Sequence, residues 1–155
     1  RSFINPDDTS FACPDDMEQA IKDFCRRTNQ PIPEQRGALV RCILESLALR
    51  YRQVMKQLDQ LSGHPSDVLH IIGGGSRNDL LNQWTANSIN KSVIAGPAEA
   101  TAIGNIMVQI LANDSTSDIA SLRKEFQNSM SLQPFEPQEP KVWDDAYEAW
   151  QKITH

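Results

Sequence analysis

The chain has 155 residues, enough for one domain with a real hydrophobic core. Its 39% hydrophobic and 23% charged residues are typical of a globular protein, and its formal net charge of -5 leaves no basic surplus for binding nucleic acid or an acidic membrane. No apolar run approaches the roughly 20 residues that a membrane helix needs, and no signal peptide is recognisable. We therefore expect a cytoplasmic protein.

The first part of the chain is predicted to be a loop followed by a helix. Residues 1–14 contain two prolines and paired aspartates, which favour irregular structure. Apolar residues at helical spacing predict a helix over residues 17–27, with Asp15 or Asp16 as its N-terminal cap. The segment NQPIPEQ ends this helix, because two prolines within so short a stretch do not suit a helix interior.

A long helix is predicted next, over residues 34–61. Its apolar residues keep an i, i+3, i+4 spacing throughout. They are Leu39, Val40, Ile43, Leu44, Leu47, Tyr51, Val54, Met55, Leu58 and Leu61. We expect this stripe to belong to the core, and Leu47, near its middle, to be fully buried.

The second half of the chain alternates short apolar runs with helical patterns. The predicted elements are strands over 68–72 and 92–95, helices over 78–89, 98–111 and 119–127, and a final aromatic-rich helix after PFEPQEP. Because a helix joins the two strands, we expect them to pair in parallel within a larger sheet. The first residue, Arg1, is not a start methionine. We therefore expect a helix-rich C-terminal piece of an α/β domain whose other strands precede this chain.

Three glycines stand at the junction of a predicted strand and helix, in LHIIGGGSRNDLLNQ at residues 69–83. The dinucleotide fingerprint G-x-G-x-x-G fits Gly73 and Gly75, but its third position holds Asn78. A Walker loop is excluded because no Gly-Lys-Ser/Thr sequence occurs. Bare backbone at this point serves either a sharp turn without a ligand or the close approach of a ligand. The triple glycine alone leaves both explanations open.

The wider sequence resembles one family. The segments that carry the resemblance are LHIIGGGSRNDLLNQ, VIAGPAEATAIGNI, FINPDD, QPIPE, ILESLALRY and PFEP. From Phe3 to about Trp150, the chain resembles the C-terminal domain of the FGGY carbohydrate kinases. The glycine motif is similar to the adenosine motif of the sugar kinase, actin and heat-shock chaperone superfamily. The resemblance implies an α/β fold of the ribonuclease H-like, actin-like ATPase type. Residues 1–155 would then be the C-terminal nucleotide-binding portion of a longer two-domain kinase.

The resemblance also implies an activity for the full-length protein. It is strongest to the branch of the family that uses ATP and Mg²⁺ to phosphorylate the 1-hydroxyl of L-rhamnulose. Family kinases that act on xylulose, fuculose or gluconate are the nearest alternatives, and a non-catalytic ATP-binding module is an alternative of another class. In this family the catalytic aspartate and the sugar site come from earlier in the chain. We therefore expect no catalytic residue here and no activity from the isolated chain.

The same resemblance assigns nucleotide-binding residues where the motif matches. Gly74 corresponds to the position whose backbone contacts the nucleotide, and Gly73 and Gly75 complete the turn. Asn78 matches a family asparagine near the nucleotide, although from the sequence it could equally cap a helix. Arg77 beside the loop is as consistent with a solvated side chain as with a phosphate contact. The isolated chain supplies only one wall of such a site, so we expect weak binding of ATP or ADP.

We expect the remaining candidate residues of this chain, Glu99 and the three histidines, to have no catalytic or metal-binding role. Glu99 sits at the start of a predicted helix and is expected to act as its cap, where a carboxylate complements the helix dipole. His64, His70 and His155 show no spacing typical of metal ligands, so we expect no metal site in this chain. The full-length enzyme is expected to be a monomer. The isolated chain is expected to self-associate through an unpaired strand edge.

The three cysteines are Cys13, Cys25 and Cys42, and none forms a C-x-x-C pair, which argues against zinc. Cys25 and Cys42 lie on successive predicted helices, and an antiparallel hairpin could bring them close enough for a disulfide. The cytosol instead favours two buried thiols. Family members that resemble this chain carry cysteines at these positions that can pair, so the resemblance leaves the disulfide open beside the two thiols.

Overall fold

The computed structural model describes residues 1–113, 118–129 and 132–154. Its helices are α1 (Met17–Arg27), α2 (Arg36–Ser62), α3 (Asp79–Ile89), α4 (Ala100–Asn113), α5 (Ile119–Ser129) and α6 (Pro140–Gln151). Its strands are β1 (Val68–Ile71), β2 (Ser92–Ala95) and β3 (Gln133–Phe135), and two short 3-10 turns cover Thr9–Phe11 and Gly74–Arg77. None of these helices is both long and apolar enough to cross a membrane.

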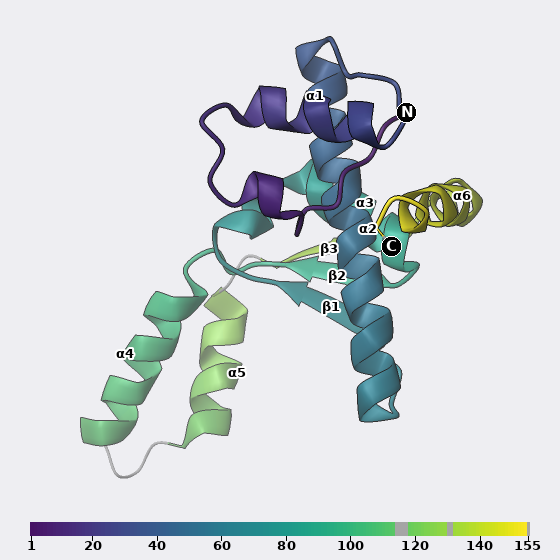
Figure 1. Cartoon of the computed structure of the whole chain (residues 1–155). Coiled ribbons are helices and arrows are strands. Elements are labelled where there is room, and N and C mark those ends of the chain that lie inside the picture. Colours follow the sequence, from purple (N-terminus) through teal and green to yellow (C-terminus); the bar gives the residue numbers. More distant parts are fainter. Residues whose placement is uncertain (114–117, 130–131, 155) are drawn as a thin grey trace.

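The three strands form one small sheet in the order β1-β2-β3 (Figure 1). Strands β1 and β2 are parallel, with Val68 opposite Ser92, which confirms the pairing expected from the helix that joins them. Strand β3 pairs antiparallel to β2, with Val93 opposite Phe135. The sequence analysis did not predict β3. It contains Pro134, a residue that sheets tolerate at an edge, where β3 lies.

Helices α1, α3 and α6 and the sheet pack along helix α2 (Figure 1). Helix α2 has 27 residues, so it is about 40 Å long at 1.5 Å per residue. Three core clusters contain residues of this helix. Near the N-terminal end of α2, Cys42 packs in a cluster with residues of α1. Further along the helix, Leu49 belongs to a cluster with residues of α6, and Met55 to a cluster with residues of α3 and the sheet. One long helix therefore holds the N-terminal loop, the last helix and the sheet together.

The buried face of α2 differs from the predicted leucine stripe. Ala48 and Leu49 are fully buried, whereas Leu47 is only half-buried, so the expectation of a fully buried Leu47 is wrong. The stripe also fails near its C-terminal end, where the side chain of Leu61 is 85% exposed. There the helix reaches past the sheet (Figure 1), so the described elements leave Leu61 largely exposed.

The buried face of α2 also carries a charge. Glu45 is 1% exposed, and its carboxylate accepts hydrogen bonds from Arg1 and Arg41, at 2.6 and 2.8 Å for the closest contacts. Buried carboxylates are tolerated when they are paired and hydrogen-bonded in this way. A hydrophobic periodicity search passes over such a position, because it counts only apolar residues.

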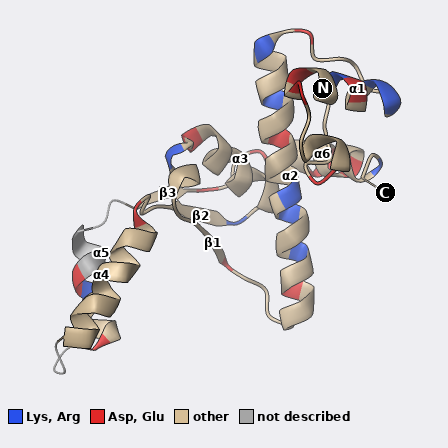
Figure 2. Ribbon diagram, turned by 60° about the vertical axis from the view of Figure 1, so that its left-hand side comes forward, with Lys and Arg blue, Asp and Glu red and all other residues tan. Residues whose placement is uncertain are grey.

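Helices α4 and α5 form a hairpin that projects away from the rest of the molecule (Figure 1). Helix α4 contains no charged residue, and Figure 2 shows it as a tan rod. Ile106 and Val108 on this helix are about half exposed or more. The described structure therefore leaves a mostly apolar helix largely uncovered.

Candidate functional site

The glycine loop lies at the carboxyl end of β1, next to the loop that follows β2. Two backbone hydrogen bonds join the loops: the N–H of Gly73 donates to the carbonyl of Pro97 at 3.2 Å, and the N–H of Gly96 donates to the carbonyl of Ile71 at 2.8 Å. In open α/β sheets, ligands bind outside the carboxyl ends of parallel strands. The two loops therefore stand where such a fold places a ligand.

The structure requires glycine at some positions of this loop and not at others. Gly73 has a φ of +76°, in the left-handed region that favours glycine, so the turn itself requires it. Gly74 has no such φ, and a Cβ added there would meet no atom within 4 Å. A Cβ at Gly75 would touch only Ile71, at an ordinary 3.9 Å. Neither a positive φ nor a close neighbour of an added Cβ requires glycine at Gly74, whose exposed backbone is therefore open on this side.

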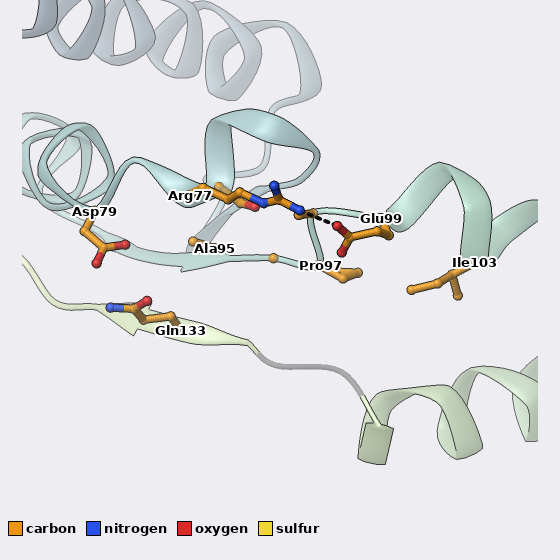
Figure 3. Close-up of a pocket in the computed structure, with 10 residues that line it drawn as sticks. Arg77, Asp79, Ala95, Pro97, Glu99, Ile103 and Gln133 are labelled. Carbon is orange, nitrogen blue, oxygen red and sulfur yellow. Dashed lines mark hydrogen bonds and ion pairs between the residues drawn. The ribbon is translucent and has the colours of Figure 1, made fainter.

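A hollow of about 340 Å³ lies between the two loops (Figure 3). Its walls come from the end of the glycine loop, the turn after β2, the start of α4 and strand β3. The residues with charged or amide side chains in these walls are Arg77, Asp79, Glu99 and Gln133. The volume lies at the lower end of the roughly 300–1,000 Å³ typical of small-molecule sites. Gly96 lines this hollow, whereas Gly73, Gly74 and Gly75 are not among its lining residues.

The start of α3 is already capped. The side-chain Oδ1 of Asn78 accepts the N–H of Leu81 at 3.1 Å, so the structure uses Asn78 as the helix cap. Asp79 in the first turn adds a negative charge at the positive end of the helix dipole. A phosphate group would meet that carboxylate. The helix start is therefore a poor phosphate site, while the bare face of Gly74 stays open to an uncharged group.

Arg77 and Glu99 form an ion pair that connects the two loops, as the dashed line in Figure 3 marks. Both side chains are more than 60% exposed, so the pair contributes little to stability. Glu99 stands directly before α4, where its backbone carbonyl accepts the N–H of Ile103. Its carboxylate turns to Arg77. The expected position of Glu99 at the start of α4 is thus confirmed. Its side chain, however, pairs with Arg77 and does not cap the helix.

One residue of this site was not foreseen from the sequence. Asn82 on α3 is fully buried, and its Nδ2 donates to the carbonyl of Ser76 at 2.9 Å. The hydroxyl of Ser76 in turn donates to the carbonyl of Gly73 at 2.7 Å. The sequence signal is the three-residue spacing of Asn82, Thr85 and Ser88, which places polar residues on one face of α3.

Among the described residues, no group of three His, Cys, Asp or Glu side chains could hold a metal ion. Glu99 near the hollow is already paired with Arg77. His64 and His70 are exposed, and His155 lies outside the described residues. The described part of the chain therefore offers no cluster of three such side chains as a metal site.

Cys25 and Cys42 lie buried in the same core cluster, between α1 and α2. No bond joins them in this structure, and Cys13 is exposed. The contact with Cys25 and burial both raise the pKa of Cys42 far above its usual value, so this thiol stays protonated. The two helices thus bring these cysteines together as the sequence predicted, and their pairing stays a prediction.

The sequence matches the C-terminal domain of the FGGY family of carbohydrate kinases over residues 1–113. It is 58% identical over 147 residues to the rhamnulokinase of Bacteroides thetaiotaomicron, covering 95% of this chain and 30% of that protein. It is 42% identical over 139 residues to the rhamnulokinase of Bacillus subtilis, covering 90% of this chain and 29% of that protein.

A solved structure shares the fold. The crystal structure of xylulose kinase from Rhodospirillum rubrum superposes with a TM-score of 0.60 at 21% sequence identity, over 79% of this chain and 25% of that chain. This likeness confirms the expected α/β fold. The chain spans about 30% of the length of the curated relatives that it matches. We conclude that the chain belongs to the FGGY family of carbohydrate kinases and matches their C-terminal domain.

Proposed function

We propose that residues 1–155 are the nucleotide-binding portion of an ATP-dependent kinase that phosphorylates L-rhamnulose at its 1-hydroxyl. The observation that carries the nucleotide assignment is Gly74, whose missing side chain neither backbone strain nor packing explains. The position of the loop at the carboxyl ends of two parallel strands supports it. The sugar assignment rests on the relatives named rhamnulokinase.

In this proposal the chain binds the nucleotide and does not perform the chemistry. The adenosine part would lie against Gly74, with Gly73 and Gly75 shaping the turn and Asn78 holding the start of α3 beside it. Asp79 would direct the phosphates away from the helix start, because like charges repel. Phosphoryl transfer also needs a base and a magnesium ion, which would neutralise the phosphate charge. Both would be supplied by the rest of the full-length protein.

The proposal includes a cellular setting and an assembly state. A kinase for a small sugar works where ATP is made, so we place the full-length protein in the cytoplasm. We expect it to be a monomer. Among the described strands of this chain, β1 lies at an edge of the sheet with backbone groups unpaired along one side, and such edges can pair between molecules. We therefore expect the isolated chain to self-associate.

The test is a coupled assay of ADP release by the full-length protein with ATP, Mg²⁺ and L-rhamnulose. We expect turnover, and L-rhamnulose 1-phosphate as the product. Xylulose, fuculose and gluconate serve as comparison substrates, and the isolated chain, which should be inactive, is the matched control. A preference for another sugar would overturn the rhamnulose assignment. ADP binding without turnover on any of the four would favour a non-catalytic module, and turnover by the isolated chain would place the catalytic base among residues 1–155.

A further inference from the structure

We propose that Asn82 is a positioning residue that holds the glycine loop in the shape that receives the nucleotide. This inference rests on the proposed function and extends it to a residue that touches neither the hollow nor the bare face of Gly74. It concerns how the core of the domain determines the shape of its binding loop.

The contacts run from the core to the loop in two steps. Asn82 lies on α3, and its buried Nδ2 donates to the carbonyl of Ser76, at 2.9 Å. The hydroxyl and the backbone N–H of Ser76 both donate to the carbonyl of Gly73, at 2.7 and 3.1 Å. Since Gly73 is the residue with positive φ, these bonds fix the turn from its two ends. Gly74 lies between the fixed points, so its exposed face is held in one orientation.

The other side-chain atom of Asn82 gives the second argument. Its Oδ1 is buried and has no hydrogen-bond partner among the described residues. A buried polar atom without a partner lowers stability, so an apolar residue of the same size would suit the packing of α3 better. Packing therefore does not explain the amide at this position. The hydrogen bond to the glycine loop explains the amide, because only a donor side chain can bind the carbonyl of Ser76.

The chain offers a matched control on the same helix. Thr85 is also fully buried on α3, and its hydroxyl donates to the carbonyl of Leu81 at 2.7 Å, within the helix itself. Thr85→Val removes one buried hydrogen bond and keeps the side-chain shape, as Asn82→Leu does. The two variants differ in that only Asn82 reaches the glycine loop.

The test measures ADP affinity by calorimetric titration, the KM values for ATP and L-rhamnulose, and the melting temperature, all in the full-length protein. We expect Asn82→Leu to weaken ADP binding and raise the KM for ATP by roughly tenfold, while the KM for the sugar changes little. Thr85→Val should leave ADP affinity unchanged. If Asn82→Leu does not fold, Ser76→Ala removes the hydroxyl bond of the second step, keeps its backbone bond, and should raise the KM for ATP by a smaller factor.

Each outcome decides the inference. ADP affinity unchanged in Asn82→Leu, or in a folded Ser76→Ala when Asn82→Leu does not fold, would overturn the positioning role and leave the proposed function standing. An equal loss of affinity in Asn82→Leu and Thr85→Val would also overturn it, because general loosening of α3 would then be the cause. A parent protein that binds no ADP would overturn the proposed function, and the positioning role with it.

Discussion

Asp8 ties the N-terminal loop to helix α1. Its Oδ1 accepts the hydroxyl of Ser10 at 2.6 Å, and its Oδ2 lies 2.6 Å from the guanidinium of Arg27. The bonds from Ser10 and Arg27 lower the pKa of Asp8 from its usual 3.8 to about 2. The folded state therefore favours the charged carboxylate. The contact stabilises the protein at any pH at which that carboxylate is ionised.

The pH dependence of this contact can be tested with Asp8→Asn. A lowered pKa adds stability above the unfolded value near 4, and this stability is lost as the pH falls through about 2. Urea unfolding should show the variant less stable at pH 7 by about 1 kcal/mol, a value kept small by solvent screening. The gap should close between pH 4 and 2. Asp15→Asn, at an exposed position, should show no gap, and a gap that persists at pH 2 would contradict the assignment.

Helix α2 provides a test at the scale of one element, with two neighbouring leucines. Leu49 is fully buried between α2 and α6, whereas Leu47 is half-buried beside a hollow of about 270 Å³ near the N-terminal loop. Leu49→Ala should lower the free energy of unfolding by about 2–5 kcal/mol, and Leu47→Ala by clearly less, because less apolar surface is lost. Urea unfolding of both variants measures this. Equal losses would show that the buried face of α2 is not the one described.

Local signals predicted most elements of the fold. Helix α1 and strand β2 have the predicted bounds, because capping residues and breakers mark them in the sequence. Strand β3 was missed because its three residues include a proline, and its pairing depends on β2, far away in the chain. The burial of Leu47 was misjudged for a related reason. Periodicity finds the apolar residues of a helix, but the packed face depends on where its neighbours lie.

The candidate site was predictable only in part, and the reason lies at the scale of the whole molecule. The glycine loop is contiguous in sequence, so Gly73, Gly74, Gly75 and Asn78 could be named from the motif. The hollow beside it combines the turn after β2 with Gln133 on β3, and only folding brings these together. The exposure of helix α4 is another feature that the sequence did not predict: the helix is largely uncovered in this structure. No pattern in this chain shows what surrounds this helix in the longer relatives.

The central claim is that a nucleotide lies against the bare backbone at Gly74, and Gly74→Val in the full-length protein tests it most directly. A Cβ added there meets no described atom of this chain within 4 Å, so the protein should fold with an unchanged melting temperature. The KM for ATP should rise roughly tenfold or more, and the KM for L-rhamnulose far less. Gly37→Val is the matched control, because an added Cβ there also meets no described atom within 4 Å, and it should leave both KM values unchanged. An unchanged KM for ATP, or equal rises in both KM values, would contradict the account.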